Sequence, residues 1–257
     1  MMELNRSTQP IVQRHLTTAM AHSDAEILEA QRLRYKVFAE EMGANLPSAD
    51  EGIDRDIFDE YCEHLLVRES DSNRVVGTYR ILSPEQAEKI GGYYSQTEFD
   101  LTRILHLSDR MVEVGRSCVH RDYRDGATIT QLWGGLAQYM QQSGHEYLIG
   151  CASIGMADGG HVAASIYRKL YRLYSAPIEY RVFPRCPLPL HALNRYLDAP
   201  IPPLIKGYLR LGAYICGEPA WDPEFNTADL LILLPMSRLS ERYAKHFLNT
   251  SKRFLQA

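Results

Sequence analysis

Several classes of protein are excluded by what this sequence lacks. Its five cysteines are scattered singly and none forms a C-x-x-C pair, so neither a disulfide framework nor a structural zinc site is expected. The longest strongly apolar stretch, 230–235, is far shorter than the roughly 20 residues of a membrane-spanning helix. The first residues contain no apolar segment typical of a secretory signal, and we therefore expect a cytoplasmic protein with reduced thiols.

The common signatures of metal, nucleotide and hydrolase sites are also missing. The sequence contains no H-E-x-x-H, Walker, G-x-G-x-x-G or G-x-S-x-G motif, and His64, His145 and His161 do not have the spacing of metal ligands. We therefore predict no metal site. The net charge is −4 and no run of basic residues is present, which argues against a nucleic-acid surface. The 45% hydrophobic and 23% charged residues are typical of a globular protein with a core.

Hydrophobic periodicity predicts both helices and strands. Residues 1–22 have no clear period and are predicted to form a loose arm. A capping box formed by Ser23 and Glu26 marks the start of the first helix, and Gly43 marks its end. Further helices are predicted at 84–90, 99–107, 129–144, 161–174 and 237–248. Strands are predicted at 64–68, 74–82, 111–119, 147–153, 178–182, 214–216 and 230–233.

The order of these elements predicts an α/β fold. A meander of strands comes first and alternation with helices follows, which indicates a mixed, predominantly antiparallel sheet with helices on both faces. The proline-rich segment 184–203 could mark a domain linker. Because the segment beyond it is too small for an independent core, we expect one domain at 23–257 with a C-terminal extension at about 184–257.

Two charged residues, Glu113 and Arg116, lie in the otherwise apolar strand predicted at 111–119. Residues three apart face opposite sides of a regular strand. Gly115 lies between them and is a natural position for a β-bulge, which would bring both side chains to one face, separate the strand from its neighbour and free a backbone N–H. A structural ion pair between Glu113 and Arg116 explains the same residues, so the strand alone leaves both interpretations open.

Further candidate residues lie on the first helix and around the first hairpin. The spacing of Asp56 and Asp59 suits two carboxylates around one cationic group, although a solvated acidic loop has the same pattern. Arg34 and Phe38 are four residues apart and share one face of the first helix. Arg80 ends the second hairpin strand.

The segment 120–127 joins a strand to a helix, where free amides and the positive end of a helix dipole suit a phosphate group. Arg121 and Arg124 add positive charge, but one glycine makes the pattern weak by itself. Cys118, with His120 as its base, is an alternative nucleophile, although a buried cysteine usually only packs.

These segments occur in one order along the chain: L-R-Y-K-V-F at 33–38, D-x-x-D at 56–59, G-T-Y-R at 77–80, E-V-G-R-S-C-V at 113–119, L-W at 132–133 and G-C-A-S at 150–153. Together they resemble the ornithine N-acyltransferases of bacterial ornithine-lipid synthesis, also called hemolysin-like GNAT proteins. The resemblance covers roughly residues 25–235. A more distant similarity is to the acyl-homoserine-lactone synthases, which share the positions of Arg34, Phe38, Asp56, Asp59, Arg80, Glu113 and Arg116.

The resemblance implies a GNAT-like acyltransferase fold. It also implies transfer of a long-chain acyl group, plain or 3-hydroxylated, to the α-amine of ornithine, which gives lyso-ornithine lipid. Both groups take the acyl chain from acyl carrier protein, which is the expected partner, and no bound cofactor is expected. From Arg124 the sequence reads R-D-G-A-T-I and lacks the second half of the Q/R-x-x-G-x-G/A loop of ordinary GNAT enzymes. This departure favours a phosphopantetheine arm on a carrier protein over coenzyme A.

We hypothesise direct acyl transfer without a covalent intermediate. Glu113, held by Arg116, is expected to take the proton from the amine, and a freed N–H beside the bulge is expected to stabilise the oxyanion. Asp56 and Asp59 are expected to bind the side-chain ammonium of the substrate. The other expected substrate-binding residues are Arg34, Phe38 and Arg80, although the two arginines could instead meet a carboxylate or fix the loop. The expected phosphopantetheine- and acyl-binding residues are Val119, Arg121, Arg124, Gly126, Ala127 and Trp133, and packing of the helix on the sheet is the alternative role of Trp133.

Three alternative functions stay open. The protein could acylate another amine, or act as an acyl-homoserine-lactone synthase, against which the long C-terminal segment argues. It could also be a non-catalytic acyl-carrier-binding or membrane-associated module, against which the intact charged sets argue. Because the product would be a lipid, peripheral contact with the inner membrane is expected, with 168–185 and 204–211 as candidate surfaces. An acidic carrier protein is expected to bind basic residues, for which the candidates are Arg121 and Arg124 with Arg168, Lys169 or Arg172.

Overall fold

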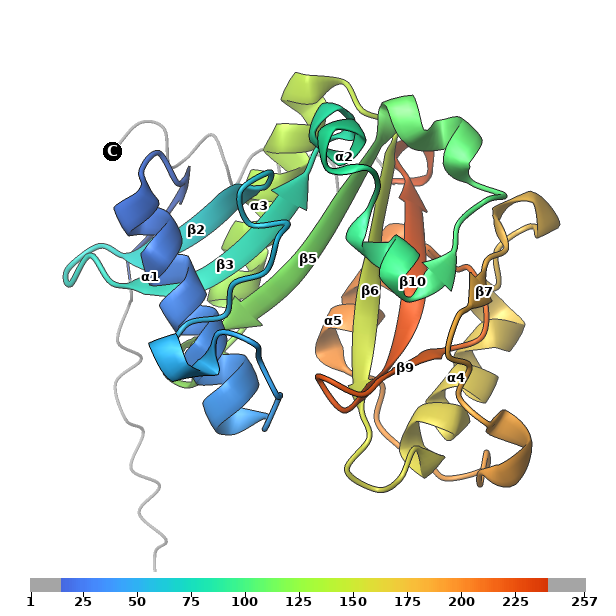
Figure 1. Cartoon of the computed structure of the whole chain (residues 1–257). Helices are drawn as coiled ribbons and strands as arrows, with labels where there is room; N and C mark the ends of the chain where they lie inside the picture. Colours follow the sequence, from blue (N-terminus) through green and yellow to red (C-terminus); the bar gives the residue numbers. More distant parts are fainter. Residues whose placement is uncertain (1–14, 240–257) are drawn as a thin grey trace, which may run out of the picture.

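The computed structural model describes residues 15–239, in which an eight-stranded sheet forms the central layer (Figure 1). Seven strands follow the order β1-β2-β3-β5-β6-β10-β8, and β9 pairs with β10. All neighbouring strands are antiparallel except β5 and β6, which confirms the predicted mixed sheet. The strands are β1 (Leu16–Met20), β2 (Glu63–Glu69), β3 (Val75–Leu82), β5 (Met111–Val119), β6 (Tyr147–Gly155), β8 (Tyr214–Ile215), β9 (Ala220–Asp222) and β10 (Thr227–Pro235), with β4 (Phe99–Asp100) and β7 (Phe183–Pro184) in a separate pair.

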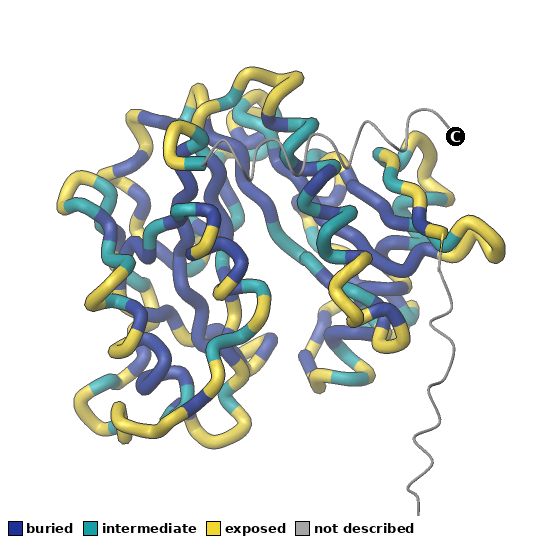
Figure 2. Tube along the Cα trace, turned by 180° about the vertical axis from the view of Figure 1, so that it is seen from behind, coloured by how far each residue is buried: buried dark blue, intermediate teal, exposed yellow. Residues whose placement is uncertain are grey.

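Helices cover both faces of the sheet, as predicted. On β2 the side chain of Leu66 packs in the cluster that contains α1, whereas Leu65 and Val67 pack in the cluster that contains α3. Since successive strand residues face opposite sides, α1 and α3 lie on opposite faces. Figure 2 shows the buried strands enclosed by half-exposed helices and exposed loops. The helices are α1 (Asp24–Tyr35), α2 (Pro84–Ile90), α3 (Ala127–Ser143), α4 (His161–Tyr174) and α5 (Pro203–Leu211).

The first helix begins and ends as its sequence predicts. The Ser23 hydroxyl accepts a hydrogen bond from the Glu26 amide at 3.4 Å, and the Glu26 carboxylate accepts one from the His22 amide at 2.7 Å. These contacts satisfy two amides at the helix start. The helix continues as a π-helical turn at Lys36–Glu41, and Gly43 follows with φ +77°. None of the helices in residues 15–239 is long and apolar enough to cross a bilayer.

Several predicted segments differ in the structure. Part of the predicted arm, Leu16–Met20, is β1 paired with β2, because a five-residue strand is too short for its alternation to be recognised. The predicted helix at 99–107 is β4 followed by a 3₁₀-helix at Leu105–Arg110, and the predicted strand at 178–182 contains a 3₁₀-helix at Ile178–Tyr180. The helix α5 and the strand β9 were not predicted. Most of the predicted helix at 237–248, and residues 1–14 of the arm, lie outside the described residues.

The two central strands, β5 and β6, pair only at one end. Their register joins residues 111–113 to 147–149, beyond which β6 continues along β10 while β5 stays beside β3 (Figure 1). On the β3 side, Thr78 pairs with Cys118 and Arg80 with Gly115, so two residues of β5 oppose Tyr79 alone. This pattern is a β-bulge. A bulge in this strand was predicted at Gly115. The structure confirms the bulge but places it one position further along, at Arg116 and Ser117.

The residue in the strained conformation is Arg116 rather than Gly115. Its φ is +49°, and such a left-handed conformation costs a residue with a side chain about 1–3 kcal/mol. Gly115 pairs in register with Arg80 and does not have a positive φ. The sequence suggested glycine because glycine adopts this conformation most easily. The structure instead stabilises the arginine through its side-chain contacts, which are described below.

Gly150 is predicted to be required where β5 and β6 begin to separate. A Cβ atom at this position would collide with the carbonyl oxygen of Val114. Gly150→Ala should therefore lower the free energy of unfolding by about 1–3 kcal/mol or more in urea titrations. Gly155→Ala is the matched control, since a Cβ there meets no atom within 4 Å. Equal stability of the two variants would contradict this description of the strand junction.

Candidate active site

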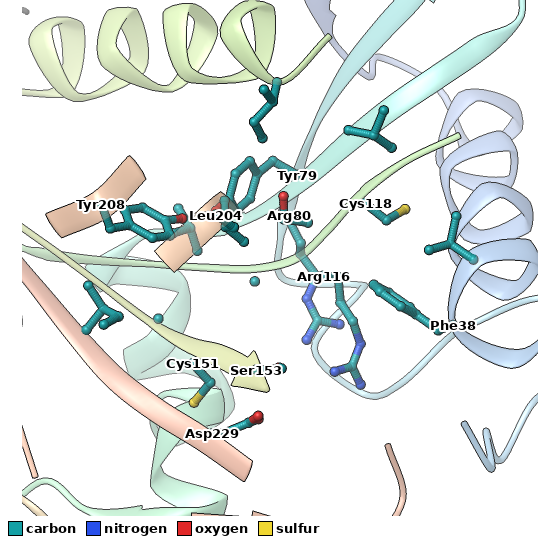
Figure 3. Close-up of a pocket in the computed structure, with 18 of the residues that line it drawn as sticks. Phe38, Tyr79, Arg80, Arg116, Cys118, Cys151, Ser153, Leu204, Tyr208 and Asp229 are labelled. Carbon is teal, nitrogen blue, oxygen red and sulfur yellow. Dashed lines mark hydrogen bonds between the residues drawn. The ribbon is translucent and has the colours of Figure 1, made fainter. Parts of the chain in front are cut away.

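A cavity of about 600 Å³ lies where β5 and β6 diverge. Its lining comes from β3, β5, β6, β10, α3 and α5 and is mostly apolar, with charged groups on one side (Figure 3). A size of this order is usual for a site that encloses a small ligand. Eight of the predicted site residues line it: Phe38, Arg80, Glu113, Arg116, Val119, Arg124, Gly126 and Trp133. The other five, Arg34, Asp56, Asp59, Arg121 and Ala127, do not belong to this lining.

Two of the predicted arginines are buried in ion pairs with the loop that precedes β2. The Nε atom of Arg34 lies 2.8 Å from Asp54 Oδ2, and its Nη2 atom lies 2.7 Å from Asp59 Oδ1. Arg80 Nη1 lies 2.6 Å from Asp56 Oδ1 and 3.1 Å from Asp59 Oδ2. Burial by itself would raise the pKa of Asp59, but the charges of Arg34 and Arg80 lower it below its usual value. These groups form a compensated buried network.

Arg116 belongs to the same network. Its Nη2 atom lies 3.1 Å from Asp56 Oδ2 and its Nε atom 3.3 Å from Asp54 Oδ2. Its guanidinium carbon lies 4.4 Å from the ring centroid of Phe225 and 5.0 Å from that of Tyr94. These contacts join the bulge of β5 to the loop before β2 and to the segment between β9 and β10. They stabilise the strained backbone of this residue.

The network corrects two sequence-based expectations. Arg116 pairs with Asp54 and Asp56, and the predicted ion pair with Glu113 is not formed. The carboxylates of Asp56 and Asp59, predicted to bind an ammonium group, are instead paired with guanidinium groups. Spacing along the chain suggested that these two carboxylates face one cation. It could not show that arginines from α1, β3 and β5 already provide the positive charge.

Glu113 is bound by the turn at 94–95 instead. Its Oε2 atom accepts a hydrogen bond from the Tyr94 amide at 2.6 Å. Its Oε1 atom accepts one from the Ser95 amide at 2.8 Å and another from the Ser95 hydroxyl. Burial raises the pKa of Glu113, and the hydrogen bonds from Ser95 and Tyr94 oppose this rise. Since each carboxylate oxygen has two lone pairs, Oε2 can still accept a hydrogen bond from a group in the cavity.

The cavity extends to the N-terminus of α3. Gly126 caps this helix with φ +96°, and the Asp125 carboxylate accepts a hydrogen bond from the Ala127 amide at 3.0 Å, so one amide of the first turn is already satisfied. Arg124 donates a hydrogen bond to the Val119 carbonyl at 3.0 Å and pairs with Glu41 at 2.9 Å. Arg121 Nε lies 3.4 Å from the same carboxylate. The predicted phosphate-binding turn thus lies at one end of the cavity.

The alternative thiol nucleophile has unsuitable surroundings. Cys118 is buried, and burial raises the pKa of its thiol to about 12, so the reactive thiolate is disfavoured. The Nε2 atom of His120 lies 3.2 Å from Lys36 Nζ, and its Nδ1 atom accepts a hydrogen bond from the Asp122 amide. Neither contact prepares the imidazole to deprotonate a thiol.

Some of the lining was not predicted from the sequence. The acidic side chains of Asp222 and Asp229 line the cavity opposite β5, and Cys151 and Ser153 lie beside them on β6. A usable signal existed for Asp229, which is a carboxylate in the apolar run of β10. Glu113 has the same feature, because it is also a charged residue in an otherwise apolar strand. The apolar side of α5 also lines the cavity; its lining residues are Pro203, Leu204 and Tyr208.

Comparison with known proteins first defines the class. Residues 33–134 match the family model described as the acetyltransferase (GNAT) domain. The fold is similar to that of the AHL synthase LasI, with a TM-score of 0.54 at 14% identity, covering 92% of this chain and 96% of that one. The predicted GNAT-like fold and the distant similarity to acyl-homoserine-lactone synthases are confirmed at the level of fold. The chain therefore contains a GNAT-type acyltransferase fold.

Two curated relatives define the family more narrowly. The chain is 37% identical over 259 residues to the L-ornithine N(alpha)-acyltransferase of Brucella abortus (strain 2308), covering 93% of this chain and 91% of that protein. It is 39% identical over 249 residues to the protein of the same name from Agrobacterium fabrum, covering 90% and 85%. The chain belongs to the family of L-ornithine N(alpha)-acyltransferases, which confirms the resemblance inferred from its motifs.

Removing one charge from the compensated network should destabilise the fold. Asp59→Asn leaves Arg34 and Arg80 short of a buried partner, and we expect a loss of about 3–5 kcal/mol in the free energy of unfolding. Glu51→Gln is the matched control, because its ion pair with Arg55 is exposed and should contribute less than about 1 kcal/mol. Denaturant titration measures both values. A loss at Asp59 no larger than at Glu51 would contradict the structural role of the network.

Proposed function

We propose that this protein transfers a long-chain acyl group from acyl carrier protein to the α-amine of ornithine, giving lyso-ornithine lipid. The observation that carries the proposal is a mostly apolar cavity of about 600 Å³ at the separation of β5 and β6, in a chain of this family. The relatives are named for ornithine, and an apolar cavity suits an acyl chain. The acyl chain is either plain or 3-hydroxylated.

The donor in this proposal is an acyl thioester on a phosphopantetheine arm. Arg124 and Gly126, at the N-terminus of α3, would contact the arm, and the acyl chain would extend toward Trp133 and Tyr208. The ring centroids of Trp133 and Tyr208 lie 5.8 Å apart, which gives this end of the cavity an aromatic wall. The missing second half of the usual phosphate loop supports a carrier protein over coenzyme A.

The surfaces for the carrier protein and the membrane are also proposals. The exposed side of α4 has three basic residues, Arg168, Lys169 and Arg172, which suit an acidic carrier protein. Because the product is a lipid, the enzyme would work in the cytoplasm with peripheral contact at the inner membrane. The candidate membrane segment 204–211 forms most of α5, whose apolar residues Ile205, Leu209 and Leu211 pack inward. The 168–185 region is the better candidate for this contact.

The proposed chemistry is direct attack of the amine on the thioester. The α-nitrogen forms a bond to the carbonyl carbon, the C–S bond breaks, and the sulfur leaves as a thiolate on the phosphopantetheine arm. Glu113 accepts the proton that the amine loses, directly or through one water. Backbone groups of β5 beyond residue 113 have no partner strand on the β6 side, so an N–H there can stabilise the oxyanion. The raised pKa of Glu113 suits a general base near neutral pH.

The direct test supplies purified protein with an acyl carrier protein thioester and one amine at a time, and detects N-acyl products by mass spectrometry. Ornithine is expected to give the largest product signal. Acyl coenzyme A in place of the carrier protein tests the donor, and matched plain and 3-hydroxyacyl chains test chain preference. A larger signal with another amine would contradict the acceptor assignment, and no product with any amine would favour a binding module.

Glu113→Gln is expected to lower kcat by about 10²–10⁴-fold, because the amide cannot take the proton. In the unsubstituted protein, kcat should rise with pH through the pKa of Glu113, and this rise should disappear in the variant. Cys118→Ala is the control and should stay within about threefold, since a buried neutral thiol takes no part in the reaction. Near-normal turnover by Glu113→Gln, or an unchanged pH profile, would exclude its role as the base.

A further inference from the structure

Among residues 15–239, a second group of acidic side chains has no positively charged partner. Asp229 is 4% exposed and lines the cavity, with its carboxylate beside Cys151 and Ser153 (Figure 3). The Oδ1 atom of Asp229 and both carboxylate oxygens of Glu98 are buried and have no hydrogen-bond partner within 3.5 Å in residues 15–239. One ligand atom each from Glu98, Cys151 and Asp229 lies within 4.8 Å of the others. Asp222, from the adjacent strand β9, also lines the cavity here.

The charges of this group are uncompensated among residues 15–239. Within that part of the chain, no lysine, arginine or histidine forms an ion pair with Glu98 or Asp229 at 4 Å or less. Burial raises the pKa of Asp229 to about 6 and that of Glu98 well above its usual value, and mutual repulsion among the acidic groups adds to the effect. A buried carboxylate without a partner is costly. A bound cation would remove this cost.

We propose that Asp229 and Glu98 bind the side-chain ammonium of the acceptor amino acid. This inference rests on the proposed function and assigns its substrate specificity. An ammonium group donates three hydrogen bonds, and the free oxygens of Asp229 and Glu98 are acceptors of the right charge. Asp222 adds negative charge, but its Oδ1 atom already accepts hydrogen bonds from the amides of Glu224 and Phe225. We expected Asp56 and Asp59 to bind this ammonium group, but arginines already pair with them. Within the described residues, Asp229 and Glu98 form no ion pair with arginine and are therefore assigned this role.

The position of this group relative to Glu113 fits a diamino acid. The Ser95 hydroxyl donates to Glu113 and lies 3.6 Å from Cys151 Sγ, which belongs to the acidic group. Glu113 and Asp229 are therefore at the two ends of one short row of side chains on the same cavity. An acceptor with its side-chain amine at Asp229 presents its α-amine toward Glu113. This arrangement selects the α-amine for acylation, because the other amine is engaged as a cation.

The test compares ornithine with norvaline, which has the same carbon skeleton but no side-chain amine. Asp229→Asn should lower kcat/KM for ornithine by about 30-fold or more, because the ammonium loses its buried charged partner. For norvaline the variant should stay within about threefold of the unsubstituted protein. Single-turnover reactions with excess enzyme allow slow norvaline acylation to be measured. Asp100→Asn is the matched control, since this carboxylate is exposed on neighbouring β4 and should affect neither substrate.

Calorimetric binding of ornithine and norvaline, in the presence of a non-reactive thioether analogue of the donor, gives a readout independent of turnover. Asp229→Asn should weaken binding of ornithine alone. Equal losses for both amino acids, or none for ornithine, would overturn the inference while leaving the proposed function intact. Failure of the unsubstituted protein to acylate ornithine would reject the proposed function itself. Zn²⁺ binding that displaces ornithine and is lost in Asp229→Asn would identify a metal site and also overturn the inference.

Discussion

The left-handed backbone at Arg116 is the constraint on which the cavity depends. It places two residues of β5 opposite one residue of β3, and β5 leaves β6 just before this point. A strained arginine persists only if its surroundings stabilise it. Asp54 and Asp56 bind its guanidinium group, and the rings of Tyr94 and Phe225 stack against it. The loop before β2 thus supports the cavity through Asp54 and Asp56, and it also lines the cavity with Phe58 and Cys62.

Two sets of carboxylates in this protein differ in their surroundings. Asp54, Asp56 and Asp59 are paired with three arginines, and this set stabilises the architecture of the site. The carboxylate oxygens of Glu98 and the Oδ1 atom of Asp229 are buried without a cation among the described residues, which suits them to receive one from a substrate. Glu113 is intermediate, because amides and a hydroxyl bind it while it still lines the cavity. The same type of side chain therefore has three roles set by its partners.

Local signals in the sequence were sufficient to predict much of the fold. The strand at Met111–Val119 and the helix at His161–Tyr174 have the predicted bounds, because their periodicity is long and their ends carry turn residues. The strand Leu16–Met20 was missed, since its stability comes from pairing with β2 rather than from a pattern of its own. The helix at 203–211 was missed because the prolines before it indicate a loop, although Pro203 occupies the first turn, where proline is tolerated.

The site could be predicted only in part. Charged residues in apolar strands indicated Glu113 and Arg116, and both line the cavity. Their partners are far apart in the sequence, so spacing alone suggested an ion pair between them that does not form. Asp229 carries the same signal in β10, but its significance depends on Glu98 and Cys151 being brought beside it by the fold. Which carboxylates are already compensated is a property of tertiary structure, and no local pattern contains it.

The most direct measurement of the central claim is a crystal structure with ornithine and a thioether analogue of the acyl donor. We expect the sulfur and the adjacent carbon to lie in the opening between β5 and β6, beside Gly115. The α-amine should lie within hydrogen-bond reach of Glu113 or of one bridging water, and the acyl chain should extend toward Trp133. Density for the analogue elsewhere on the protein, with the cavity empty, would show that this cavity is not the active site.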